Sequence, residues 1–410
     1  MAAALSGCSR VPLARNSGPL KQGGYLWQRA WTQPVADAFG QAQAQFDSVT
    51  ILAGEIVWEG ARPRLTKSTI RWDVVAQAKN PTTLALRVAP FSGPFASADA
   101  NAGFITATAK SLLDEAASHG AKIAEFQLDF DCAQKKLAGY RDWLNALRVA
   151  IQPMPLSITA LPSWLDEPEF NHLLGTVDDY VLQVHSVPAR NPDDRATMCD
   201  PQRAKIAVEK AAHLGKRFTV ALPTYRCLGG YAPDGKLLGV AMDSVQPSWP
   251  GGTRVLEFAS DPVELAKLVA DWQGDRPSEM NAIVWYRIPI ESDLRNWRWP
   301  TLRAVMEGRE PVHKLALERA GENPIDLELF NDGEAEERFA GSVTATWKSE
   351  ILVASDAVAG WAVQANHGCA VFAPERDAAL RLLPGERRAI GWLRYDRPAQ
   401  LELLLAPTTR

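Results

Sequence analysis

The chain has 410 residues, of which 46% are hydrophobic and 22% charged, and its formal net charge is −4. This is the composition of an ordinary globular protein, long enough for one large domain and one small one. It is not basic enough to indicate nucleic-acid binding, and no run of like charges resembles an interaction tail. No stretch approaches the roughly 18 consecutive apolar residues that a membrane-spanning helix needs.

The first 22 residues are typical of a targeting segment and a tether. Leu5-Ser6-Gly7-Cys8 resembles the lipobox of bacterial lipoproteins, in which small residues precede a cysteine that becomes acylated. Hardly any basic or apolar segment precedes it, so two interpretations stay open. One is a remnant of a longer signal peptide, which predicts a periplasmic-side envelope protein held to the membrane only through lipid on Cys8. The other is a chance match in a frayed N-terminus with one exposed thiol.

From residue 23 onward, strand-like apolar runs alternate with helical patterns. The expected strands cover 24–31, 49–57, 83–90, 122–131, 155–162, 180–187, 217–225 and 281–290. The expected helices cover 34–46, 69–78, 102–119, 137–149, 167–174, 200–214, 261–272 and 299–307. Asp200-Pro201 and Asp261-Pro262 are typical of an N-cap followed by proline at the first helical position.

Eight strand-then-helix units over about 290 residues match a (β/α)8 barrel in number and size. An open doubly wound sheet is the alternative, but no Gly-rich phosphate loop follows the first strand. The sequence therefore predicts the α/β class, with a (β/α)8 TIM-like barrel over residues 23–309. Its seventh unit is unusually long, and a Pro-Asp-Gly turn between alternating segments predicts an inserted hairpin at about 228–258.

Residues 310–410 have a different character. Short alternating runs are divided by Asn-Asp-Gly and Pro-Gly turns, which predicts a small all-β, sandwich-like domain.

The cysteines give one structural prediction. Their spacing does not indicate a zinc site. Cys199 and Cys227 lie in the loops after the sixth and seventh strands, which are neighbours on the same face of the barrel. In an exported protein these two could form a disulfide, and we expect one there.

The segment EFQLDFDC at the end of the fourth strand raises the functional question. Gln127, Asp129 and Asp131 alternate with apolar residues, so all three side chains lie on one face of the strand. Ionised carboxylates are costly to bury without partners, so an apolar core explains them poorly. Because barrel enzymes carry their chemistry at the C-terminal ends of the strands, we expect the two aspartates to form the centre of a site.

Other strand ends carry polar and aromatic residues that converge on the same place. Asp129, Asp131, Glu55 and His185 are the catalytic candidates, and the substrate-binding candidates are Trp27, Arg29, Trp31, Arg87, Gln127, Gln183, Tyr225, Trp285, Tyr286 and Arg287. Such a site suits a carbohydrate, because sugar rings stack on aromatic faces while their hydroxyls bond to polar groups. No cofactor and no metal is expected, since arginines can balance the carboxylates and one histidine reaches the rim.

Several roles stay open at this point. The two aspartates can be catalytic, one raising the pKa of the other, or can form an ion-pair network with arginines that only fills the barrel top. His185 can act as a general base or be a satisfied buried histidine. The tryptophans can be sugar platforms or core residues.

Two resemblances accompany these residues. The QLDFD segment resembles the Asp-x-Asp signature of family-18 chitinase-like barrels, in which a Glu two positions after the last Asp is the acid. This sequence has Ala133 at that position. The segments FQLDFDC, LSITALPSWL, YVLQVHSV and IGWLRY resemble the bacterial family called domain of unknown function 3142, over nearly the whole chain. That resemblance implies the barrel and assigns no activity.

Three functions remain open from the sequence. The first is a glycoside hydrolase-like envelope lipoprotein acting on a polysaccharide, favoured by the paired aspartates. The second is a non-catalytic glycan-binding lipoprotein, favoured by Ala133. The third is a structural lipoprotein whose β domain binds a protein partner.

Overall fold

The structure is a computed structural model that describes residues 12–60, 62–95, 99–185, 187, 197–242, 248–375 and 380–406. Cys8 and the lipobox-like residues lie outside these ranges. The chain divides into two compact units, residues 1–296 and 297–410. Within the described ranges, no helix is long and apolar enough to cross a membrane.

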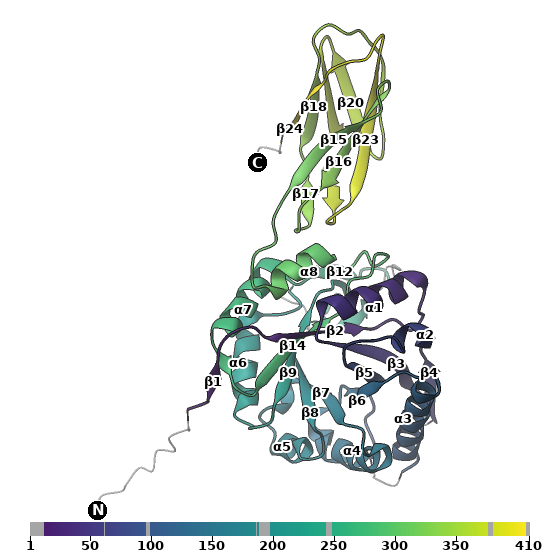
Figure 1. Ribbon diagram of the computed structural model, residues 1–410, viewed down its shortest axis with the longest axis vertical. Helices are drawn as coiled ribbons and strands as arrows, with labels where there is room; N and C mark the ends of the chain where they lie inside the picture. Colours follow the sequence, from purple (N-terminus) through teal and green to yellow (C-terminus); the bar gives the residue numbers. More distant parts are fainter. Residues whose placement is uncertain are drawn as a thin grey trace, which may run out of the picture. The chain divides into compact units, whose positions relative to one another are not determined.

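Eight parallel strands close into a barrel in the first unit, which confirms the predicted fold (Figure 1). Around the barrel they run β2 (Lys21–Leu26), β14 (Met280–Tyr286), β9 (Phe218–Pro223), β8 (Asp179–Gln183), β7 (Leu156–Ala160), β6 (Ile123–Phe130), β5 (Thr82–Val88) and β3 (Ser48–Glu59). The pairing of β2 with β3 closes the ring. All eight C-terminal strand ends therefore meet at one end of the barrel, which we call the barrel mouth.

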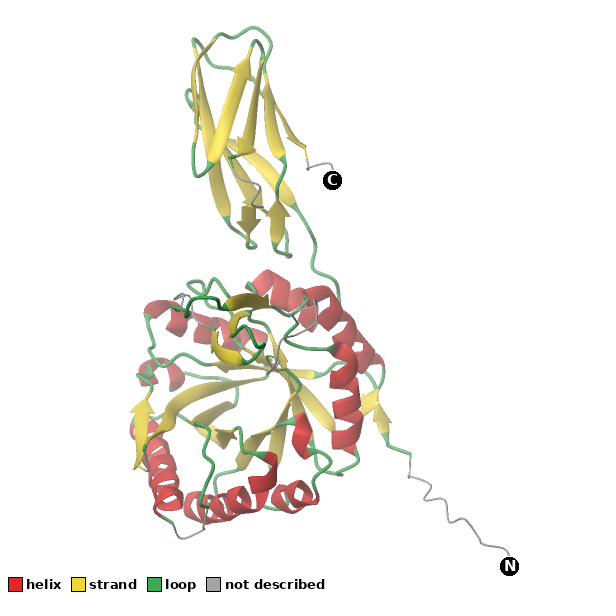
Figure 2. Cartoon of the chain, turned by 180° about the vertical axis from the view of Figure 1, so that it is seen from behind, coloured by secondary structure: helices red, strands yellow, loops and turns green. Residues whose placement is uncertain are grey.

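Helices form a layer outside these strands (Figure 2). They are α1 (Gln33–Gln45), α2 (Trp72–Val75), α3 (Ala100–Ser118), α4 (Leu137–Ile151), α5 (Pro168–Leu174), α6 (Pro201–Ala212) and α7 (Pro262–Gly274). In α4, Leu137, Tyr140, Leu144 and Leu147 are buried at the spacing of one helical face. The expected aspartate caps are confirmed, because Asp200 and Asp261 each accept hydrogen bonds from the first backbone N–H groups of α6 and α7. The expected helix over 69–78 shortens to α2 alone.

Short strands extend the barrel at two places. β4 (Arg62–Lys67) pairs antiparallel with β3 and lengthens it into a hairpin. β1 (Arg15–Asn16) pairs with β13 (Arg276–Pro277), and the Arg15 guanidinium lies 2.7 Å from Glu209 and 2.8 Å from Asp275. The chain is thus fixed to the barrel from its first described residues.

The insertion in the seventh unit has nearly the predicted bounds but one more strand than the predicted hairpin. It is a three-stranded antiparallel sheet in the order β11 (Leu237–Ala241), β10 (Cys227–Tyr231), β12 (Arg254–Phe258). The first two strands are the expected hairpin, and the third was missed. One face of this sheet packs into an apolar cluster of Met198, Tyr225, Cys227, Tyr231 and Phe258.

The predicted disulfide between Cys199 and Cys227 is wrong. Both cysteines are free and buried. The Sγ of Cys227 lies 3.4 Å from the Sδ of Met198 within the apolar cluster, while the backbone of Cys199 is held by the Thr197 hydroxyl beside the start of α6. Burial raises the pKa of each thiol to about 12, so both behave as small apolar side chains.

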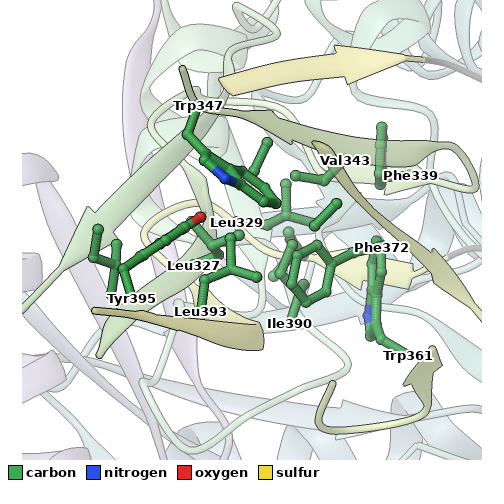
Figure 3. Packing of buried hydrophobic residues seen from close by; sticks show 14 residues of the cluster. Leu327, Leu329, Phe339, Val343, Trp347, Trp361, Phe372, Ile390, Leu393 and Tyr395 are labelled. Carbon is green, nitrogen blue, oxygen red and sulfur yellow. The ribbon is translucent and has the colours of Figure 1, made fainter. Parts of the chain in front are cut away.

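The second unit contains α8 (Trp299–Met306) followed by the predicted all-β domain. One sheet runs β15 (Leu315–Ala320), β16 (Ile325–Asn331), β23 (Arg387–Tyr395), β19 (Leu352–Ala357), and the other runs β20 (Trp361–Asn366), β21 (Cys369–Pro374), β18 (Ser342–Thr346), β24 (Glu402–Ala406). The short strands β17 (Glu337–Phe339) and β22 (Leu380–Leu382) pair beside them. Leu327 and Leu393 of the first sheet and Val343 and Phe372 of the second share one core, as in a sandwich (Figure 3).

Candidate active site at the barrel mouth

One arginine connects the three acidic candidates. Arg87 lies near the end of β5, between β3 and β6, and its Nη1 lies 2.7 Å from Oδ2 of Asp129. Its Nη2 is 3.6 Å from Asp131, and its Nε is 3.7 Å from Glu55. Burial alone would lower the pKa of Arg87, but the two aspartates outweigh it, so the net shift is upward. The ends of β3, β5 and β6 therefore bring these charged side chains together.

Asp129 is the buried member of the pair. Its side chain is 2% exposed, and its carboxylate accepts hydrogen bonds from Arg87 and, at 2.7 Å, from the Thr159 hydroxyl on β7. A charged partner and a second hydrogen-bond donor offset the free-energy cost of burying this carboxylate. Asp129 is thus a fixed negative charge beneath the mouth.

Asp131 follows the end of β6 and is the accessible member. Its side chain is 38% exposed. Burial of the carboxyl raises its pKa, the negative charge of Asp129 raises it further, and Arg87 opposes both, with a net upward shift. The two aspartates share a strand face, yet one is buried and paired with Arg87 while the other is accessible and has a raised pKa. That is the pattern of an acid beside an ionised partner.

Aromatic rings line the mouth around Tyr286. Its ring centroid lies 5.7 Å from Tyr25, 5.4 Å from Trp27, 5.8 Å from His185 and 5.4 Å from Tyr225. Trp27, Tyr286 and His185 are only partly buried, so ring surface remains accessible to solvent. The predicted wall of flat apolar surface is present, although not all of its predicted members belong to it.

His185 stacks on Tyr286 with an interplanar angle of 24°. Its Nδ1 lies 3.2 Å from the carbonyl oxygen of Ala221, a contact that requires the proton on Nδ1 and leaves Nε2 as an acceptor. Burial lowers the pKa of His185 to about 4. The imidazole is therefore neutral near pH 7, and this arrangement favours a hydrogen-bond acceptor for a ligand hydroxyl over a strong general base.

Two predicted tryptophans are not at the mouth. β2 ends at Leu26, so the alternation expected through Trp31 does not hold, and the Trp31 ring is buried 5.4 Å from Phe39 of α1. Trp285 precedes the inward-facing Tyr286 and therefore points outward. It is fully buried, and its indole N–H donates to Gln22 at 2.7 Å. Both are core residues of the helix–strand layer.

The remaining candidates divide by what they contact. Arg29 is exposed and lies 2.7 Å from Glu55, so it belongs to the carboxylate network at the rim. Arg287 is buried and pairs with Asp293 at 2.6 Å, whereas Arg87 is the arginine that pairs with the two aspartates. Gln183 lies at the end of β8 on the inward face that it shares with Val181, and it is partly exposed.

Gln127 lies below the mouth, in a polar network that sequence reasoning did not find. It is 1% exposed, and it accepts a hydrogen bond from the Tyr25 hydroxyl at 2.6 Å and donates one to Ser157 at 3.2 Å. Ser157 donates in turn to Glu125. Gln127 is therefore satisfied within the barrel and is not a substrate contact. The signal for its partners was present, because Ser157 and Thr159 alternate in the same way as Gln127 and Asp129.

Glu125 gives this network a pH dependence. Burial raises its pKa to about 7 from 4.5, with Ser157 opposing the shift and the nearby Asp179 adding to it. Between pH 4.5 and about 7, the Glu125 carboxyl has lost its proton in the unfolded chain but keeps it in the folded chain. The free energy of unfolding should therefore fall as the pH rises from about 4.5 to about 7, and level off above.

Replacing Glu125 by glutamine should remove this loss. The amide oxygen still accepts from Ser157, and we expect a gain of roughly 2 kcal/mol at pH 8 and almost none at pH 4.5, measured by urea unfolding. Glu115→Gln is the control with the opposite sign, because Lys67 lowers the pKa of Glu115. An unchanged pH slope in Glu125→Gln would contradict the prediction.

Comparison with known families now identifies the barrel. The model for "Domain of unknown function (DUF3142)" matches residues 81–291, just over half of the 410 residues. The chain belongs to the DUF3142 family. The match runs from β5 through β14 and so includes the segments that carry Arg87, Asp129, Asp131 and His185. No curated protein is a significant match.

Solved structures with similar folds are remote in sequence. The spore cortex-lytic enzyme SleL of Bacillus cereus is 13% identical over 72% of this chain and 75% of that one, with a TM-score of 0.48. A chitinase of Bacillus thuringiensis is 10% identical over 95% and 100%, with a TM-score of 0.43. A chitinase of Bacteroides thetaiotaomicron is 12% identical over 66% and 90%, with a TM-score of 0.44. This likeness is one of fold and carries no argument about the activity of the DUF3142 chain.

Proposed function

We propose that the barrel mouth binds a polysaccharide and hydrolyses a glycosidic bond, with Asp131 as the general acid. The observation that carries the proposal is the contrast between the two aspartates. Asp129 is 2% exposed and held by Arg87, whereas Asp131 is 38% exposed with a raised pKa. An accessible carboxyl with a raised pKa, beside a buried carboxylate that is paired with arginine, is suited to protonate a leaving-group oxygen.

The proposed step uses groups that face the mouth. The Asp131 carboxyl gives its proton to the glycosidic oxygen as the bond from that oxygen to the anomeric carbon breaks. Water supplies the hydroxyl that completes hydrolysis. Glu55, held by Arg29 and Arg87, is the candidate to orient that water and to accept the proton that the water loses as its oxygen bonds to the anomeric carbon. Asp129 supplies negative charge beneath the positive charge that develops on the sugar ring.

The ring surface and the polar groups match a carbohydrate. Trp27 and Tyr286 offer aromatic surface to a pyranose face, and Nε2 of His185 offers an acceptor to a hydroxyl. The second candidate function is glycan binding without turnover. Ala133 favours it, since the related chitinase signature has its acid at that position.

A glycan array combined with chromogenic glycosides tests both candidates on the full chain. Turnover of any glycoside supports the hydrolase, and binding without turnover selects the glycan-binding function. Neither binding nor turnover across glycans of the bacterial envelope would remove the basis for a carbohydrate at this site.

We also infer that the protein is lipid-anchored through Cys8 on the periplasmic side of the envelope. The support is the lipobox-like Leu5-Ser6-Gly7-Cys8 sequence. Expressed from its complete native gene, the protein should incorporate a fatty-acid analogue and partition into detergent, and Cys8→Ser should do neither. Equal labelling of the two proteins, or none in the native one, would rule out the anchor.

A further inference from the structure

A bulge in the second unit turns one tryptophan away from the core. On β23, Gly391 pairs with Leu327 of β16, but the next pair along is Ala389 with Glu328, so Ile390 is an extra residue. Ile390 and Leu393 are both in the core although they are three residues apart, and Trp392, next to Leu393, faces the outer side of the sheet. Bulges re-aim side chains in this way.

The bulge depends on a glycine. A Cβ on Gly391 would lie 2.4 Å from the Phe372 ring and 2.5 Å from the backbone oxygen of Asp356, so no larger residue fits there without movement. Gly391 therefore takes the inward-facing position on the strand, where there is no room for a side chain. The next residue, Trp392, faces outward. The sequence Ile390-Gly391-Trp392 specifies this arrangement.

Trp392 is bracketed by two carboxylates. It is directly opposite Asp326 on β16 and Asp356 on β19, and both aspartates are exposed. Since neighbouring strands lie about 4.8 Å apart, the two acidic residues are about 10 Å from each other with the indole between them. Ala354 lies diagonally beside the ring on β19 and leaves it room.

Trp392 is partly buried, so part of its side chain is accessible to solvent. It makes no hydrogen bond, aromatic contact or cation–π contact with any of the described residues, although Arg394 is two residues away on the same face. Of the two carboxylates, Asp356 accepts a hydrogen bond from the adjacent backbone N–H of Ala357 and from no other group in the described part of the chain. By contrast, Phe330 on the same outer face is covered by the Arg387 guanidinium, 4.0 Å from the ring.

We propose that Trp392, Asp326 and Asp356 form a second carbohydrate-binding site, which holds the polysaccharide chain independently of the barrel mouth. The choice of a polysaccharide rests on the function proposed for the barrel. A pyranose ring presents an apolar face to the indole, and its equatorial hydroxyls extend to both sides, where each carboxylate accepts a hydrogen bond. One sugar unit fills the space between the two aspartates.

Other occupants fit this face less well. A nucleic acid could stack a base on the indole, but its phosphates would meet the two carboxylates. A protein interface of stable size needs a wide apolar patch, whereas this face has Trp392, and Phe330 beneath Arg387, among charged residues and alanines.

Retention of the full chain on insoluble polysaccharides tests the site. Chitin, cellulose and peptidoglycan sacculi are the probes, and depletion from the supernatant is the readout. Trp392→Ala should bind roughly tenfold more weakly than the unaltered chain to the polysaccharide that retains it, whereas Trp392→Phe should keep most of the binding because a flat ring remains. Phe330→Ala is the matched control, since it removes an aromatic residue from the same face that is already covered by arginine.

The outcomes separate this site from the barrel. Retention that depends on Trp392 and not on Asp131 supports the proposal, even if no glycoside is ever hydrolysed, in which case only the barrel function fails. Equal retention of Trp392→Ala and the unaltered chain would overturn the proposal. So would a lack of retention on all three polysaccharides, or an equal loss in Phe330→Ala.

Discussion

Replacement of Arg87 by methionine is expected to lower the free energy of unfolding by about 3–5 kcal/mol at pH 7. The guanidinium is the cation at 2.7 Å from Asp129, whose side chain is 2% exposed. Without it, Asp129 is a buried carboxylate whose remaining partner is the Thr159 hydroxyl, and folding must then bury an uncompensated charge. Urea unfolding of the full chain measures the change.

Two comparisons connect this loss to the charge of Asp129. The double variant Arg87→Met/Asp129→Asn should regain most of the stability, because a neutral amide replaces the orphaned carboxylate. In Arg87→Met alone, the deficit should shrink as the pH falls, because a protonated carboxyl carries no charge that burial leaves uncompensated.

The matched control is Arg29→Met. This arginine also pairs with an acidic residue of the mouth, at 2.7 Å from Glu55, but its side chain is 60% exposed. Exposed pairs contribute little, so we expect a loss below about 1 kcal/mol. Similar losses in Arg29→Met and Arg87→Met, or no recovery in the double variant, would contradict the account of Asp129 as a buried charge that depends on Arg87.

The sequence was sufficient to predict the barrel and the acidic centre of its mouth. Strand periodicity places Gln127, Asp129 and Asp131 on one face, and chain order places Arg87 on the neighbouring strand. The Asp200 and Asp261 caps place the starts of α6 and α7 within one residue. These signals are local, and each of them agrees with the closed fold.

The errors at the mouth have a common physical cause. Successive residues of a strand point to opposite faces, so Trp285 and Tyr286 could not both line it, and periodicity alone does not say which one does. The prediction that Trp31 lines the mouth is wrong because β2 ends at Leu26. Side chains need not alternate between two faces beyond the last paired residue of a strand. Tyr25 lies two residues before Trp27, so alternation places both side chains on the same face. Tyr25 is nevertheless absent from the predicted site residues.

Other features depend on contacts that the sequence does not encode locally. The pairing of β12 with β10 joins residues separated by a long loop, so a hairpin was expected where a three-stranded sheet forms. The partner of Cys227 is the sulfur of Met198, next in sequence to the predicted partner Cys199. Two loops on the same barrel face were correctly brought together, but the disulfide was assigned one residue away from the side chain that is in contact.

The second large effect is expected at Asp131. If the barrel is a hydrolase, Asp131→Asn should reduce kcat by about 10²- to 10⁴-fold, because the amide cannot donate the proton that the leaving oxygen needs. The free energy of unfolding of Asp131→Asn should differ from that of the native protein by less than about 1 kcal/mol, since the Asp131 side chain is 38% exposed and lies 3.6 Å from Arg87. Activity is measured on the glycoside that the native protein turns over, and stability by thermal unfolding.

The pH profile distinguishes an acid from a binding residue. In the native protein, kcat should fall as the pH rises through the pKa of Asp131, because the catalytic form is the protonated one and burial holds that pKa above the ordinary value. Asp131→Asn should lose this alkaline limb along with most of its rate. Glycosides with activated leaving groups should be affected least, since their departure needs little protonation. A variant that unfolds at a much lower temperature yet keeps its rate would instead make Asp131 a part of the ion-pair network alone.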